Sequence, residues 1–280
     1  MSEGARFCPR CGKPVDQDVR FCPSCGASLL VQPPPAPADP SPPTDQPPYQ
    51  PAPLSYSSGL GFLKVAEDLL RRRRDVFANI KSGQGLNRFL LNANLAILLF
   101  AAIYGATMGA YPGGLQILYS IVKIPLLLVI TMYVALPTYY VLDAFSGGDV
   151  SLRQIAAVIV SSFAIMSIVL LAFVPVSLFF ILTTPGQGFS TYAFIVLLNV
   201  GIFTIAGVAG LVYQFSGMGH IHSSTRWGSA FVIGLLVEMF VGTQMAWVLR
   251  PYFDTGPFVR PLEGNFYIAL IKLIARALGG

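Results

Sequence analysis

The residues with the clearest chemistry are four cysteines, all of which lie within the first 25 positions of a 280-residue chain. They form two Cys-x-x-Cys-Gly repeats, and the four cysteines are Cys8, Cys11, Cys22 and Cys25. Each repeat places two thiolates at the ends of a tight turn, so that both pairs can converge on one tetrahedral ion. The spacing therefore predicts a structural Zn²⁺ site, with a pair of disulfides as the alternative.

Four cysteine ligands leave no open position on the metal, which favours a folding role over catalysis. Phe7-Cys8-Pro9 and Phe21-Cys22-Pro23 are near copies, as expected of the two knuckles of a small zinc ribbon. We predict this ribbon over residues 1–31, where the metal would replace a core that so short a segment cannot build. Basic residues diluted by acidic ones, without an aromatic stacking stripe, favour a protein over nucleic acid as the partner of the ribbon.

The elements that would position this ribbon follow it along the chain. Residues 32–58 are rich in proline and have little to bury, which predicts a semi-rigid extended tether. Docking of this linker into an aromatic groove of a partner is the alternative. Residues 59–85 carry apolar side chains at helical spacing and predict an amphipathic basic helix on the cytoplasmic surface of a membrane. Its arginine run would meet anionic lipid headgroups. The run is Arg71, Arg72, Arg73 and Arg74.

The composition identifies a membrane protein. Hydrophobic residues make up 54% of the chain and charged residues 11%, against about 25% charged in a typical soluble domain. A membrane-spanning helix needs about 20 apolar residues, and five such runs occupy residues 86–249. We expect an all-α domain of about five transmembrane helices. The expected spans are residues 86–110, 115–142, 152–182, 189–215 and 227–249.

The distribution of basic residues predicts the orientation. Seven of the 18 basic residues lie between Lys64 and Arg88, directly before the first span, and basic flanks of a span stay on the cytoplasmic side. The expected location is a bacterial inner membrane, crossed several times, with a cytoplasmic N-terminus. Five spans then place the C-terminus on the periplasmic or extracellular side, and a missed re-entrant turn is the alternative.

Polar residues inside the apolar block are candidates for a second site, because a charge in hydrocarbon usually faces the bundle interior and has a partner. Glu238 lies near the middle of the fifth span and Lys123 lies in the second. We predict that an ion pair between them is geometrically feasible, with Asn199 and Gln244 extending it by hydrogen bonds. A structural role is favoured over a proton or ion relay.

Two further patterns concern packing and the end of the last span. Glycines in the fourth span predict close helix approach; they are Gly201, Gly207 and Gly210. Trp247 and Arg250 predict a membrane interface at the end of the fifth span, and residues 250–280 predict an interfacial tail with a second amphipathic helix. His220 and His222 form a His-x-His pair without further nearby ligands, which disfavours a second metal site.

The exit of the last span carries a resemblance. Residues 247–252, followed by Glu263-Gly264-Asn265-Phe266-Tyr267, resemble a group of bacterial multi-span membrane proteins, some of which have an N-terminal zinc ribbon. The five-span layout is also similar to the Yip family of Golgi and endomembrane trafficking proteins. This resemblance implies a protein without enzymatic activity that recruits partners or shapes the membrane.

The sequence thus leads to two functional hypotheses. The first is a membrane scaffold or regulatory protein whose cytoplasmic zinc ribbon, or proline-rich linker, recruits a protein partner, and a homo-oligomer is left open. The second is a small ion or proton channel or transporter that uses Glu238 and Lys123 and is gated by the ribbon. No pattern of catalytic residues stands out, so we expect no enzyme.

Overall fold

The computed structural model describes residues 6–8, 10–16, 19–29, 60–184, 188–222, 227–250, 258 and 266–279. The chain divides into two compact units, a small N-terminal module and a helical domain, and each is described by itself. The tether predicted at 32–58 lies outside the described residues.

The N-terminal module has very little regular structure. Strand β1 (Arg6–Phe7) pairs in antiparallel fashion with β2 (Pro14–Val15). In the second half of the module an isolated antiparallel bridge joins Phe21 to Ser28. Each half therefore folds back on itself over a few residues, and backbone pairing alone gives the module little stability.

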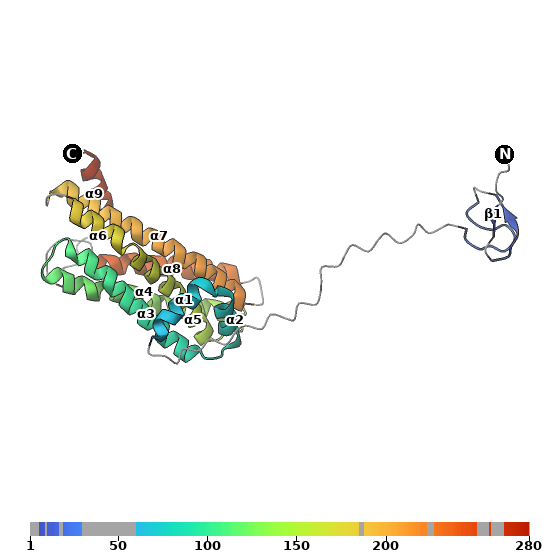
Figure 1. The fold of residues 1–280 in the computed structure, drawn as a ribbon, viewed down its shortest axis with the longest axis horizontal. Helices are drawn as coiled ribbons and strands as arrows, with labels where there is room; N and C mark the ends of the chain where they lie inside the picture. Colours follow the sequence, from blue (N-terminus) through green and yellow to red (C-terminus); the bar gives the residue numbers. More distant parts are fainter. Residues whose placement is uncertain are drawn as a thin grey trace. The chain divides into compact units, whose positions relative to one another are not determined.

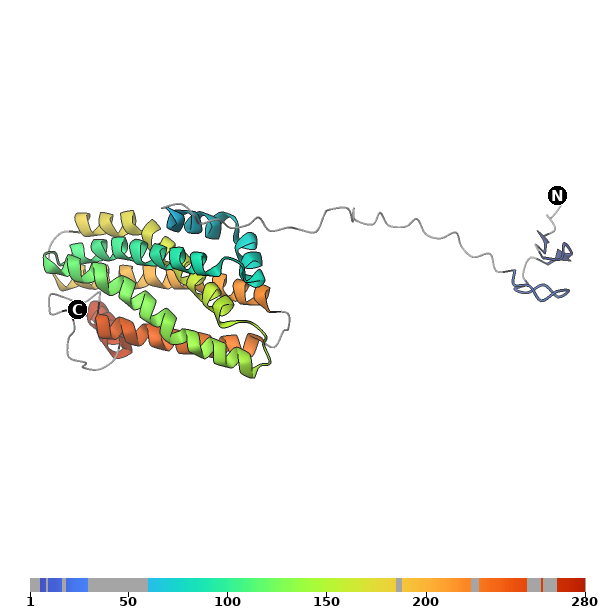
Figure 2. The same ribbon diagram turned by 90° about the horizontal axis from the view of Figure 1, so that it is seen from below.

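The helical domain is built almost wholly from long apolar helices (Figures 1 and 2). Its elements are α1 (Gly61–Arg71), α2 (Arg73–Ser82), α3 (Leu86–Ala110), α4 (Leu115–Phe145), α5 (Leu152–Ala172), α6 (Val174–Thr183), α7 (Phe189–Ile221), α8 (Trp227–Leu249) and α9 (Phe266–Gly279). Within the described residues, five helical segments are long and apolar enough to cross a membrane, with α5 and α6 counted as one. The predicted all-α domain with five transmembrane helices is confirmed.

The long helices pack in a row that folds back on itself. Helix α3 packs on both α4 and α5, α7 packs on the other side of α5, and α8 packs on the other side of α4. Helices α7 and α8, at the two ends of this row, make few contacts with each other. Most of the buried side chains that hold the row together are apolar, and Ile97, Tyr104, Ile124, Met132 and Val158 are examples. The arrangement leaves space between the α5–α7 and α4–α8 pairs.

Prolines shape two of the spans differently. The third span is broken at Phe173, where α5 ends and α6 begins with Pro175 in its first turn. Proline is tolerated there because the first amides of a helix need no intrahelical partner. Pro125 and Pro137 lie inside α4, which remains one helix from Leu115 to Phe145. Each of the three prolines removes an amide donor and is expected from sequence to kink its helix. The third span breaks beside Pro175, whereas α4 continues through Pro125 and Pro137 as one helix.

The amphipathic helix expected before the first span differs from the prediction in two ways. It is two helices, α1 and α2, separated at Arg72. Its apolar side is covered by protein, because Val65, Val76 and Phe77 are fully buried and the two helices pack on α3, α5 and α7. Helices α1 and α2 therefore close one end of the bundle, whereas α9 lies at the other end (Figure 1).

The glycine prediction for the fourth span holds at one position of three. A Cβ on Gly210 would lie 3.0 Å from the carbonyl oxygen of Ser162 on α5, so this glycine allows a close approach. A Cβ on Gly201 or Gly207 would meet nothing within 4 Å. These two glycines therefore make no close helix contact.

Candidate functional site

The four cysteine sulfurs converge in the N-terminal module. The Sγ atoms of Cys8 and Cys25 are 3.7 Å apart, as are those of Cys11 and Cys22, and all four lie within 4.8 Å of one another. A tetrahedral zinc ion with Zn–S bonds of about 2.3 Å requires sulfurs about 3.8 Å apart. The same distances are far too long for disulfides, whose sulfurs lie about 2.0 Å apart. The four thiols therefore fit a zinc ion and not the disulfide alternative.

The backbone builds the two halves of this site in the same way. The amide of Gly12 donates to the carbonyl of Cys8, and the amide of Gly26 donates to the carbonyl of Cys22, at 2.9 and 2.8 Å. Both glycines have positive φ angles, 68° and 69°, which side chains other than glycine rarely adopt. Each Cys-x-x-Cys-Gly repeat is thus a turn that directs two sulfurs to one point.

Comparison with known families agrees with this geometry. Residues 3–29 match the zinc-ribbon domain family. The N-terminal module is a zinc ribbon. No curated protein and no solved structure matches the chain. The family match covers the ribbon alone, so the resemblance of the helical domain to the Yip family stays a prediction.

The fold of the zinc ribbon shifts the pKa values of two of its thiols in opposite directions. Backbone hydrogen bonds from Arg10 and Cys11 lower the pKa of Cys8 to about 6, so this thiol is ionised at neutral pH. The backbone of Ala27 lowers the pKa of Cys25, but Cys11, burial and the other two thiols outweigh it and raise the pKa to about 12. Zinc held by four thiolates would thus displace a proton from Cys25, and with no open position it would serve the fold.

The side chains around the four sulfurs include two exposed phenylalanines. Phe7 and Phe21 directly precede the first cysteine of each repeat and are 64% and 61% exposed. The buried positions of the ribbon are taken by Cys8 and Cys22, each 2% exposed. The metal site therefore supplies the interior of the ribbon, and the two phenylalanines face outward.

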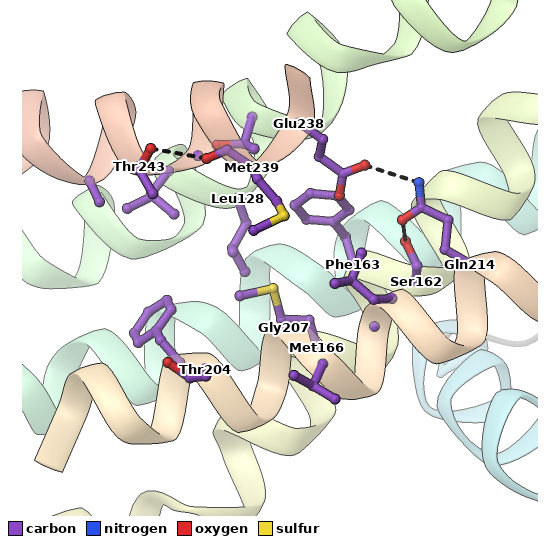
Figure 3. Close-up of a pocket in the computed structure, with 18 of the residues that line it drawn as sticks. Leu128, Ser162, Phe163, Met166, Thr204, Gly207, Gln214, Glu238, Met239 and Thr243 are labelled. Carbon is purple, nitrogen blue, oxygen red and sulfur yellow. Dashed lines mark hydrogen bonds between the residues drawn. The ribbon is translucent and has the colours of Figure 1, made fainter. Parts of the chain in front are cut away.

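A second cluster of polar side chains lies inside the helical domain. Tyr139 on α4 donates its hydroxyl to Oε2 of Glu238 on α8 at 2.6 Å, and the amide of Gln214 on α7 donates to the same oxygen at 3.0 Å. The hydroxyl of Ser162 on α5 donates to the carbonyl oxygen of Gln214 at 3.1 Å. All four residues are buried. Glu238 thus links four of the five spans. Figure 3 shows its bond to Gln214 and the bond between Gln214 and Ser162.

The predicted ion pair between Glu238 and Lys123 is wrong. The α4 residue that bonds Glu238 is Tyr139. Lys123 lies on the same helix but 16 residues earlier, which is about 24 Å along the axis at a rise of 1.5 Å per residue. The ammonium of Lys123 lies 5.9 and 5.3 Å from the ring centroids of Tyr119 and Phe258. The prediction counted the depth of each residue from the outer end of its own span, whereas α4 has 31 residues and α8 has 23, so the outer ends of the two helices need not lie at the same level.

Asn199 and Gln244 do not extend the Glu238 cluster. Asn199 accepts a hydrogen bond from the hydroxyl of Tyr104 at 2.7 Å and donates to the carbonyl of Ile195 at 2.8 Å. It therefore joins α7 to α3 at a separate point. Gln244 is half-buried on α8 and has no bond to Glu238 among the described contacts.

The arginine run is divided between protein and solvent. Nε of Arg72 donates to Asp75 at 2.9 Å, and its guanidinium lies 3.7 Å from buried Asp68. Arg71, Arg73 and Arg74 are exposed. Arg72 therefore holds the junction of α1 and α2 together, and Arg71 lies 3.7 Å from Glu67 on the same helix. Contact of the exposed arginines with lipid headgroups stays a prediction.

Two polar contacts mark the ends of α8. At its C-terminal end the guanidinium of Arg250 lies 4.1 Å from the ring centroid of Trp247, and Trp247 is buried. At its N-terminal end Trp227 stacks on His222, whose Nε2 contacts the carboxylate of Asp143. His220 instead packs on Phe77, so the two histidines serve different contacts, and no third metal ligand joins them among the described residues.

Sequence reasoning missed Gln214, Tyr139 and Ser162. It ended the fourth span at residue 215, which left Gln214 at the expected membrane surface, whereas α7 continues to Ile221. A glutamine within an otherwise apolar run was the available indication. Tyrosine and serine occur too often in membrane helices to stand out from sequence.

Proposed function

We propose that the protein is an integral membrane scaffold or regulatory protein whose zinc ribbon recruits a protein partner to the cytoplasmic face. The observation that carries this proposal is the exposure of Phe7 and Phe21. Aromatic side chains are among the residues that contribute most to protein interfaces. Two of them at equivalent positions of a metal-folded module, neither used for its interior, are suited to bind a protein.

The closed metal site supports the same role. Because four thiolates complete the coordination of zinc, the ribbon has no position at which a metal-bound water could act. The ion would fix the two turns and with them the positions of Phe7 and Phe21. The proline-rich linker at 32–58 offers a second partner site, since extended proline-rich segments dock into aromatic grooves.

The orientation follows from the basic end of the helical domain. Arg71, Arg73 and Arg74 are exposed where α1 and α2 close the bundle. Each basic residue near an anionic leaflet contributes about 1 kcal/mol, and basic flanks stay cytoplasmic. We place this end and the ribbon in the cytoplasm of a bacterium, with the helices in its inner membrane and α9 at the outer surface. The channel hypothesis loses the ion pair on which it was based.

Crosslinking and purification of the full-length protein from its own membranes would test recruitment. We expect one protein to be recovered with the parent and lost with the double variant Phe7→Ser/Phe21→Ser, while that variant still binds one zinc ion. Val19→Ser removes another exposed apolar side chain of the ribbon (38% exposed) and should recover the same partner. Recovery of that protein with the double variant at parental yield would refute the proposal.

A further inference from the structure

An apolar cavity lies beside the Glu238 cluster. It has a volume of about 450 Å³ and is lined by residues of α4, α5, α7 and α8. It occupies the space between the α5–α7 and α4–α8 pairs, where α7 and α8 make few contacts. Figure 3 shows Phe163, Met166 and Met239 around it, with Glu238 at one end. Cavities of about 300–1,000 Å³ are typical of sites for small molecules.

Glu238 presents one oxygen that the fold does not satisfy. Both donors, Tyr139 and Gln214, bond to Oε2, and no described residue bonds to Oε1. The side chain is 8% exposed and forms part of the cavity lining. No ion pair with Glu238 occurs among the described residues, which is costly for a buried carboxylate. A positively charged donor that reached Oε1 from the cavity would supply the partner that a carboxylate at this position lacks.

We propose that this cavity binds a lipophilic amine, with its ammonium group on Oε1 of Glu238 and its apolar body among the side chains of the lining. The ring of Phe163 adds an aromatic wall beside the charged group, which favours a cation. Methionines such as Met166 and Met239 adapt to apolar bodies of different shape. A fatty acid or another anion is disfavoured, because its charge would face that of Glu238.

A pair of probes of equal shape separates charge recognition from simple filling of the cavity. We would measure saturable binding of 1-naphthylmethylamine and of 1-naphthalenemethanol to the full-length protein in nanodiscs, with empty nanodiscs subtracted. The parent should bind the amine at least about tenfold more tightly than the alcohol, because hydrogen bonds to charged groups are stronger than neutral ones. Equal binding of the two probes, as expected if the cavity only accommodates apolar chains, would overturn the proposal.

Three variants locate the site. Glu238→Gln keeps the shape and should remove the preference for the amine while the alcohol still binds. Gly207→Leu places a side chain in the open space of the cavity lining and should abolish binding of both probes. Gly201→Leu is the matched control on the same helix, also with nothing within 4 Å of a Cβ, and should bind as the parent does. The assignment of the site would be contradicted if Gly207→Leu bound the amine as tightly as the parent protein does. It would also be contradicted if Glu238→Gln still bound the amine more tightly than the alcohol.

Discussion

The hydroxyl of Tyr139 on α4 donates a hydrogen bond of 2.6 Å to Glu238 on α8, between two residues that are 99 positions apart in the chain. This bond attaches the last span to the interior of the bundle. Gln214 brings α7 to the same carboxylate. The two helices at the ends of the folded row are therefore joined through Glu238, in addition to the ring contacts of Phe215 on α7 with Trp227 and Phe231 on α8.

Removal of the Tyr139 hydroxyl should destabilise the bundle. In Tyr139→Phe the carboxylate of Glu238 keeps only Gln214 as a donor, so we expect the free energy of unfolding to fall by about 1–2 kcal/mol. The adjacent residue provides the control, because Tyr140 is 39% exposed. Tyr140→Phe should change the free energy by no more than about 0.5 kcal/mol. Reversible unfolding in mixed micelles measures both, and equal effects would show that the bond to Glu238 carries no weight.

The contact between α3 and α4 gives a test of helix packing. A Cβ on Gly105 of α3 would collide with the backbone of Ser120 on α4, so Gly105→Ala must push the helices apart. We expect a loss of about 1–3 kcal/mol in the free energy of unfolding. Gly201→Ala meets nothing within 4 Å and should be neutral or stabilise by up to about 1 kcal/mol through helix propensity.

The result of this pair would bear directly on the packing of the row. If Gly105→Ala were as stable as the parent, α3 and α4 could not lie as close together at Gly105 and Ser120 as the structure places them. Measurement of both variants in the same micelles removes differences that arise from the detergent.

The zinc ribbon should bind one metal ion in a pH-dependent way. Metal analysis of the full-length protein should give one zinc per chain, and Cys11→Ser should lower both the content and the affinity because three thiolates remain. The pKa of Cys25 is raised to about 12, so binding at neutral pH displaces its proton and the apparent affinity must rise with pH. The pKa of Cys8, about 6, adds little to this dependence above neutral pH.

Competition with a chromophoric chelator at several pH values would measure the zinc affinity. An affinity that is constant between pH 6.5 and 8.5, about the range in which ordinary thiols begin to ionise, would contradict the proton displacement. Two zinc ions per chain would contradict a single four-cysteine site.

Much of the architecture can be predicted from local sequence. Cys8 and Cys25 could be paired with the other ligands because the metal chemistry depends on spacing within a few residues. The starts of the long helices follow from turn residues such as Gly85 and Gly114, which precede α3 and α4. Apolar runs of this length have few other solutions in lipid.

The hydrogen-bond partners of buried polar groups cannot be predicted from local sequence. Glu238 could be recognised as an exception in an apolar helix, but its partner depends on the relative shift of α4 against α8, which no local pattern records. A shift that placed Lys123 beside it was as consistent with the sequence as the one that places Tyr139 there. The coverage of α1 and α2 by the bundle was missed for a related reason, since an apolar helix face looks the same whether it meets lipid or protein.

The most direct test of the account is the side of the membrane on which each end of the bundle lies. Single cysteines at Gln84, after α2, and Pro112, between α3 and α4, are both exposed positions and can be placed in a chain whose ribbon cysteines are serine. With a membrane-impermeant maleimide, we expect Pro112→Cys to be labelled in intact bacterial cells and Gln84→Cys to be labelled only after permeabilisation. Labelling of Gln84→Cys in intact cells would place the arginines and the zinc ribbon outside and contradict recruitment of a cytoplasmic partner.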